Sequence, residues 1–176
     1  MTLFHYYTYL KSFKEFDRAE ISISCVFLAC KLDYNFLKFD EALAIYDRLR
    51  KMKKGTPDFV KFEIEIIDFL GFEIEIETPY KYLYIYLGEN MPHLLKDEEF
   101  KSLAYNLIND SYRRPLCLYF HPKYIALVII FVALETSEKP ISIENLMNYD
   151  KNLSMKIFLQ CLDNFLKIFE IKLAKI

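Results

Sequence analysis

Few residues of this sequence are spaced for the common kinds of chemistry. The 3 histidines, His5, His93 and His121, are scattered, and no cysteine or carboxylate accompanies them at the spacing of a metal site. The 3 glycines lie too far apart to form a phosphate-binding loop or a dinucleotide-binding fingerprint. No motif of an acyl-transfer enzyme stands on a strand-to-helix turn. We therefore expect no bound metal, no cofactor and no catalytic residue.

The 4 cysteines lie in apolar, helix-like surroundings. Cys25 and Cys30 are five positions apart, so on one helix their side chains diverge and make a poor pair of metal ligands. The first residues, MTLFH, lack the charged start and cleavage site of a secretory signal. We therefore expect reduced core thiols in an intracellular protein, with disulfides as the alternative that an even number of cysteines suggests.

The charged residues in distinctive positions have ordinary interpretations on local sequence. Lys31 and Asp33 follow an apolar stretch and are interpreted as a solvated helix end, with a cation that complements the helix dipole. Glu63 would be a surface carboxylate. The basic run 48–54 is interpreted as a solvated helix terminus, because no aromatic platform for nucleic acid accompanies it. A nuclear-import signal is the other interpretation of that run.

Composition bounds the size and class of the protein. A chain of 176 residues, 53% of them hydrophobic, can form one large domain or two small ones. With 23 basic and 25 acidic residues the net charge is −2, which disfavours a protein held to nucleic acid through its phosphates. The longest apolar run, 125–134, is half of the roughly 20 residues that a membrane-spanning helix needs, and so indicates a buried core helix.

Helical periodicity covers most of the chain. Asp17 is the expected N-cap of the second helix, with Glu20 completing an acidic capping box. Segment 72–77 alternates with period two, but a lone strand has no partner in a helical chain, so we predict an extended connector there. The fold prediction is an all-α protein of nine helices, at 3–13, 18–31, 39–54, 57–70, 79–87, 96–112, 122–136, 143–147 and 154–171.

A weak internal repeat accompanies this pattern. Segments 21–31 (ISISCVFLACK) and 125–135 (IALVIIFVALE) align at an offset of 104 positions, with three identities. Both are apolar helices with a small residue at the same place. Two similar helical bundles joined by the connector would explain the repeat.

Several segments match motifs of one family of helical proteins. Segment 27–33 (FLACKLD) is similar to the cyclin-box helix that ends in an Ala-Ala/Ser-Lys-hydrophobic-Glu-Glu pattern, and 66–73 (IIDFLGFE) resembles the helix that closes the box. Segments 78–83 (TPYKYL) and 109–111 (NDS), with the His-Pro step at 121–122, resemble cyclins of the transcription and RNA-processing type. Within that group 11–13 (KSF) and 45–51 (IYDRLRK) look nearest to cyclin L, with cyclins K and T also similar.

The resemblance covers essentially the whole chain and implies two tandem cyclin-like helical repeats. Residues 1–77 would be a first cyclin box that lacks its first helix, with the connector, and residues 78–176 the second repeat. The implied function is that of a regulatory subunit rather than an enzyme. It would bind and activate a cyclin-dependent serine/threonine protein kinase of transcription or pre-mRNA processing, as a nuclear heterodimer without membrane or direct nucleic-acid contact.

The resemblance also implies roles for individual residues. Lys31 and Glu63 match a lysine and a glutamate that hold each other and bind backbone groups of a kinase helix. Asp33 matches an acidic residue that faces arginines of the kinase activation loop. The implied apolar contact with the kinase helix is made by Leu28, Leu32, Phe72 and Ile74. The Phe72 ring is expected to be half core and half interface.

Two departures from the family pattern keep rival functions open. Tyr34 stands where a second glutamate is usual, and the first helix of the box is expected to be missing. Either the protein is a reduced cyclin, or its start codon is misassigned, or the sequence is a fragment. A degenerate cyclin that binds a kinase or a transcription factor without activating it is therefore the alternative. A general-transcription-factor-like cyclin fold that binds DNA is a further rival, against which the net charge argues. No motif supports an all-α enzyme.

Overall fold

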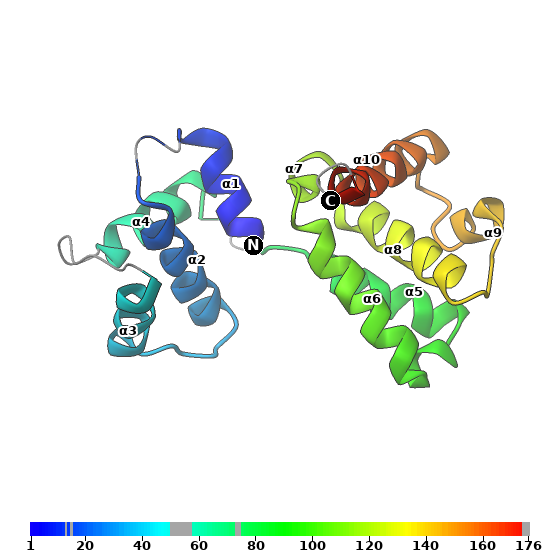
Figure 1. Cartoon of the computed structure of the whole chain (residues 1–176), viewed down its shortest axis with the longest axis horizontal. Helices are drawn as coiled ribbons and strands as arrows, with labels where there is room; N and C mark the ends of the chain where they lie inside the picture. Colours follow the sequence, from blue (N-terminus) through cyan, green and yellow to red (C-terminus); the bar gives the residue numbers. More distant parts are fainter. Residues whose placement is uncertain (13, 15, 50–57, 73–74, 174–176) are drawn as a thin grey trace. The chain divides into compact units, whose positions relative to one another are not determined.

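The structure, a computed structural model, describes residues 1–12, 14, 16–49, 58–72 and 75–173. Within these ranges it contains ten α-helices, one short 3-10 helix and no strand, so the predicted all-α fold class is confirmed. The helices form two compact units, Met1–Ile76 and Glu77–Ile176 (Figure 1). The interpretation of residues 1–77 and 78–176 as two cyclin-like repeats stays a prediction.

In the first unit α2 (Arg18–Leu32) is the central helix. Three other helices pack against it: α1 (Thr2–Leu10), α3 (Phe39–Leu49) and α4 (Phe59–Phe69). One cluster of buried residues joins α2 to α1 and α4, and a second, rich in aromatic rings, joins α2 to α3 and α4. The buried side of α2 is therefore the side that faces its three neighbours.

Side-chain caps determine where α2 and α4 begin. The Asp17 carboxylate accepts hydrogen bonds from the backbone N–H groups of Ala19 and Glu20 at 2.8 and 3.3 Å, which confirms the predicted N-cap. The Glu20 carboxylate accepts a hydrogen bond from the backbone N–H of Asp58 at 2.8 Å. Asp58 in turn caps α4 by accepting from the N–H of Lys61 at 3.0 Å. These bonds tie the start of α4 to the start of α2.

In the second unit α8 (Pro122–Thr136) is the central helix. Three long helices pack against it: α5 (Pro79–Asn90), α6 (Glu98–Ser111) and α10 (Met155–Leu173). The short elements of the unit are η1 (Leu94–Lys96), α7 (Leu116–Tyr119) and α9 (Ile143–Met147). Every residue of α8 from 124 to 130 is buried, as the apolar run predicted. This helix is enclosed on most sides.

The ends of α2 and α8 share one motif. Tyr34, after α2, and Glu138, after α8, both have a φ of 55°. The N–H of the next residue, Asn35 or Lys139, bonds at 2.9 Å to the carbonyl five positions earlier, which is a Schellman motif. Both helices have 15 residues, and their bounds differ by the same 104 positions as the repeat in the sequence. The structure therefore supports an equivalence between α2 and α8.

Most predicted helix bounds agree with the structure within a few residues, and those of α8 and α9 agree at both ends. The prediction of nine helices missed η1 and α7, because three or four residues are too few to show a period. The predicted end of the third helix at 50–54 and start of the fourth at 56–57 lie outside the described residues. Residues 75–78 have no regular secondary structure, as expected of a connector.

Candidate functional site

An ion pair joins the last turn of α2 to α4. The Lys31 ammonium lies 2.6 and 2.7 Å from the two carboxylate oxygens of Glu63. It also lies 4.4 Å from the centroid of the Phe27 ring, in a cation–π contact. The Lys31 side chain is 38% exposed and that of Glu63 is 14% exposed. The ion pair is thus packed against the protein on one side and accessible to solvent on the other.

This ion pair is better suited to contacting a partner than to stabilising the fold. Ion pairs with this much solvent access contribute about 1 kcal/mol or less to stability. An ammonium carries three N–H donors and a carboxylate several acceptor positions, so the pair keeps hydrogen-bonding capacity for a partner's backbone. No catalytic step follows from one lysine and one glutamate that neutralise each other. The arrangement therefore fits binding rather than chemistry.

Leu28 and Leu32 lie beneath this surface. Leu28 is buried in the core shared by α1, α2 and α4, and Leu32 is half-buried against the same core. Leu32 retains exposed surface at the end of α2, whereas Leu28 can act only by holding the helix in place. Their predicted role in an apolar partner contact stays a prediction, and Ile74 lies outside the described residues.

Phe72 does not have the half-buried position expected of it. Its side chain is 72% exposed, and both Phe72 and Gly71 before it have a φ of 62°. Two successive left-handed residues turn the chain away from the end of α4 and leave the ring in solvent. The expectation of a half-core ring is therefore wrong, while the predicted contact of the ring with a partner stays a prediction.

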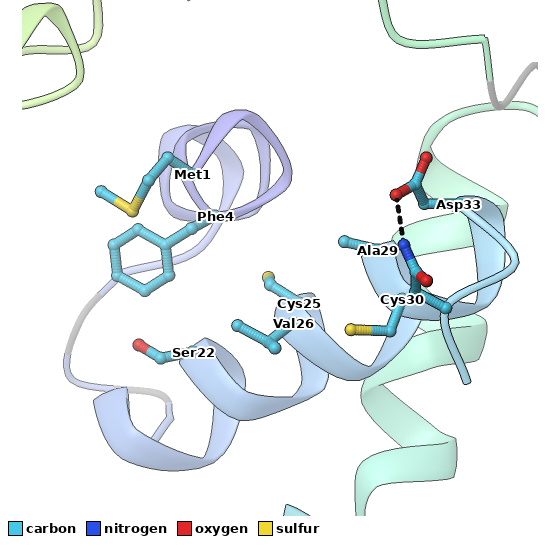
Figure 2. Close-up of a pocket in the computed structure, with 9 residues that line it drawn as sticks. Met1, Phe4, Ser22, Cys25, Val26, Ala29, Cys30 and Asp33 are labelled. Carbon is cyan, nitrogen blue, oxygen red and sulfur yellow. Dashed lines mark hydrogen bonds between the residues drawn. The ribbon is translucent and has the colours of Figure 1, made fainter. Parts of the chain in front are cut away.

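Asp33 is not brought to the ion pair. Two positions beyond Lys31, it points about 200° away around the helix axis. Its carboxylate accepts a hydrogen bond from the Asn35 side chain at 2.9 Å and lines a groove on another side of α2 (Figure 2). The structure thus places Asp33 on a different side of α2 from Lys31, and its predicted role toward the kinase activation loop stays a prediction.

Sequence reasoning missed two residues beside the pair. Val60 and Ile64 are exposed and one turn apart on α4, and both lie to the same side of Glu63 around the helix axis. Helical geometry places both within about 100° of Glu63, on the side away from the buried residues of α4. Their signal in the sequence is a second apolar stripe with a spacing of four, next to the stripe that forms the core. Together with the ion pair they form a mixed surface of one salt bridge and exposed aliphatic side chains.

The remaining ionisable groups give no sign of a reactive centre in the described part of the chain. All 4 cysteines are free, and burial raises the pKa of the Cys25 and Cys161 thiols to about 12. A thiol with such a pKa is protonated at neutral pH and a poor nucleophile. Over the same residues no cluster of histidine, cysteine and carboxylate side chains could hold a metal ion. None of the described helices has the length and apolar character to span a bilayer.

Known proteins similar to this chain are cyclins. Cyclin-L2 of Mus musculus is 28% identical over 158 residues, which cover 79% of this chain and 29% of Cyclin-L2. Cyclin-L1-1 of Arabidopsis thaliana is 27% identical over 157 residues, covering 79% of this chain and 36% of the relative. Cyclin-C1-1 of the same plant is 28% identical over 170 residues, covering 92% of this chain and 66% of the relative.

The similarity is broad but modest in identity. No protein-family model matches the chain. The chain spans less than a third of the length of Cyclin-L2, so it corresponds to a part of that relative. Its similarity to two kinds of cyclin nevertheless extends over most of its residues, and the all-helical fold agrees with it. These findings support the assignment of the chain to the cyclin family.

Proposed function

We propose that this chain is the regulatory subunit that binds and activates a cyclin-dependent serine/threonine protein kinase acting in transcription or pre-mRNA processing. Cyclins are regulatory subunits and not enzymes themselves. The observation that carries the proposal is the partly exposed Lys31–Glu63 pair between α2 and α4, with the exposed Val60 and Ile64 to one side of it on α4. The similarity to cyclins of the L and C kinds supports the transcriptional role and a nuclear location.

The mechanism is a population shift in the kinase. The ion pair would hydrogen-bond to backbone groups of the kinase's mobile helix, and the aliphatic side chains beside it would cover apolar residues of that helix. Contacts that form only with the active kinase conformation move its equilibrium toward that conformation by as much as they favour it. The partner in this proposal is the kinase alone, in a heterodimer without metal or cofactor.

Charge reversal at Lys31 tests the proposal. In Lys31→Glu two carboxylates face each other, so we expect at least a tenfold loss of kinase retained in co-purification, together with loss of phosphorylation of a polymerase-tail peptide. Because the pair is partly exposed, the free energy of unfolding should fall by only about 1 kcal/mol. Each cyclin-dependent kinase of the organism would be co-expressed in turn with the full chain.

The matched control is Glu135→Lys, which reverses the charge of the exposed residue equivalent to Lys31 on α8. It should leave kinase retention unchanged. Retention of the kinase by Lys31→Glu, or equal loss in both variants, would show that the contact surface lies elsewhere.

The position of Asp33 favours a second candidate function. If the residue expected to face the activation loop points away from the ion pair, the chain could bind a kinase without completing its active site. The same co-expression separates the two functions. Retention with phosphorylation supports the activator, and retention without phosphorylation supports a cyclin-fold protein that binds without activating.

A further inference from the structure

A row of tyrosine rings lies where α5 and α6 of the second unit pack together (Figure 1). Tyr80 and Tyr84 are one turn apart on α5, and Tyr105 is on α6. The Tyr105 ring is a neighbour of both α5 rings, because its centroid lies 5.6 Å from that of Tyr80 and 6.3 Å from that of Tyr84. Asn109 follows one turn after Tyr105. These four residues are called the tyrosine surface below.

Hydrogen bonds between side chains hold the rings of the tyrosine surface in place. The Tyr80 hydroxyl donates to Oδ1 of Asn109 at 2.8 Å. The hydroxyls of Tyr84 and Tyr105 form a hydrogen bond with each other. Both bonds join α5 to α6, so the rings are ordered by the fold itself. A ligand that binds here therefore loses little affinity to the ordering of these side chains.

The tyrosine surface is accessible although the apolar sides of both helices are buried. α5 and α6 both pack their apolar residues against α8 in the core of the second unit. Tyr84 is 48% exposed, Tyr80 and Tyr105 are half-buried, and Asn109 is exposed. The tyrosine surface is thus not a core face of either helix. Tyrosine suits a contact surface because its ring is apolar while its hydroxyl is well hydrated in the free protein.

Three hydrogen-bond donors at this surface have no protein partner in the described residues. The Tyr84 and Tyr105 hydroxyls carry two hydrogens and use one of them for the bond between them, which leaves one O–H. The Asn109 amide accepts a bond through Oδ1, and neither of its two N–H groups has an acceptor among the same residues. The surface therefore combines three aromatic rings with three available donors.

The charged side chains of α6 near the tyrosine surface neutralise each other in pairs. The Lys101 ammonium lies 2.6 Å from the Glu98 carboxylate, and the Arg113 guanidinium lies 2.9 Å from the Asp110 carboxylate. A nucleic acid would require unpaired cations at its binding surface, and a basic peptide would require unpaired carboxylates. Charge complementarity therefore favours an uncharged ligand that supplies hydrogen-bond acceptors.

We propose that the tyrosine surface is the docking site for a proline-rich segment of a partner protein. Proline has an apolar ring and no backbone N–H, so a run of prolines offers carbonyl acceptors and no backbone donors. Such a run adopts the polyproline II helix, which leaves its carbonyls open and binds aromatic surfaces at a low entropic cost. The proline rings pack on the tyrosine rings, and the carbonyls accept from the three donors.

The dimensions of the tyrosine surface suit a short segment of this kind. A polyproline II helix rises about 3.1 Å per residue, so the ring-to-ring steps of 5.6 and 6.3 Å together span at most about four residues. The tyrosine surface belongs to the second unit, whereas Lys31 and Glu63 belong to the first. The inference therefore goes beyond the proposed kinase contact and does not depend on it.

The test uses decaproline as the probe. Fluorescently labelled decaproline is titrated with the full 176-residue chain and followed by anisotropy. A labelled peptide of the same length with alternating glycine and alanine is titrated in parallel. We expect saturable binding of decaproline with a Kd below about 1 mM, and binding of the glycine-alanine peptide that is at least about tenfold weaker.

Variants separate the contribution of the rings from that of the donors. Tyr84→Ala removes an exposed ring and should weaken binding at least about tenfold. Tyr84→Phe keeps the ring and frees the Tyr105 hydroxyl to donate outward, so it should weaken binding less than about threefold. Asn109→Asp keeps the acceptor for Tyr80 but removes both N–H donors, and should weaken binding at least about fivefold.

The matched control is Tyr119→Ala, which removes a tyrosine that is 67% exposed on α7, outside the tyrosine surface. It should leave the binding of decaproline unchanged. Circular dichroism would establish that each variant keeps its helices. Three outcomes would overturn the proposal: no binding of decaproline up to about 1 mM, equal affinity for the glycine-alanine peptide, and binding that Tyr84→Ala or Asn109→Asp leaves unchanged.

Discussion

The central helices of the two units have the same length and the same ending, yet they are buried differently. α2 and α8 both have 15 residues and both end in a Schellman motif with a left-handed residue that is not glycine. α8 is covered on most sides by α5, α6 and α10, while α2 has neighbours on one side and an open groove on the other. The two helices thus share a backbone conformation but differ in how many helices pack against them.

This difference shows that the formation of a helix and the burial of its faces have different causes. A helix can form from its own caps and local bonds, as Asp17 and the turn at Tyr34 show for α2. How much of it is buried depends on how many other helices pack against it. The second unit is therefore expected to be the more stable one.

The largest expected effect is at the equivalent positions Ile130 and Val26. Ile130→Ala removes a fully buried side chain and should lower the free energy of unfolding of the second unit by about 2–4 kcal/mol. Val26→Ala, at an exposed position, should change the free energy of unfolding of the first unit by less than about 0.5 kcal/mol. Hydrogen exchange resolved by mass spectrometry during urea titration would report each unit separately. Equal effects at the two positions would show that the α2 face is covered in solution.

A smaller effect is expected from an ion pair of the second unit. The Lys123 ammonium lies 3.0 Å from the Asp150 carboxylate, and the hydrogen bond from Lys123 is the main reason that the pKa of Asp150 is lowered. A lowered pKa stabilises the fold at pH values above the unfolded pKa of about 4, and this contribution is lost as the pH falls through the folded pKa. Asp150→Asn should therefore cost about 1 kcal/mol at neutral pH and progressively less in acid.

The pH dependence of the Asp150→Asn variant shows whether the charge of Asp150 or the shape of its side chain stabilises the second unit. Urea midpoints of the second unit in Asp150→Asn and in the unchanged chain would be compared at neutral pH and near pH 3. If the difference between the two proteins does not shrink in acid, then the Asp150 charge is not what stabilises the unit.

The smallest effect is expected at the two helix ends that the units share. Tyr34→Gly and Glu138→Gly each place glycine at a φ of 55°, which costs glycine little. Each variant should stabilise its own unit by about 0.5–1 kcal/mol, measured by the same exchange experiment. Similar gains would strengthen the equivalence of α2 and α8, whereas a gain in one unit alone would weaken it.

The accuracy of the sequence-based predictions follows the strength of the local signal. The bounds of α8 could be predicted because His121-Pro122 begins it and a continuous apolar run fills it. The four-residue α7 has no such signal and could not. The Lys31–Glu63 pair was implied only by resemblance to a family, since nothing local connects residues 32 positions apart. Phe72 was misjudged because period-two alternation carries no information about the left-handed turn before it.

By itself, the sequence determined which of the longer segments are helical, where α2 is capped, and that the chain resembles cyclins. These properties depend on residues close together in the chain. Only the tertiary structure decided that Val26 is exposed while Ile130 is buried, that Lys31 meets Glu63, and that Asp33 does not. The physical reason is that α2 and α8 are apolar around most of their circumference, so periodicity cannot say which face is covered, and neighbouring helices decide it.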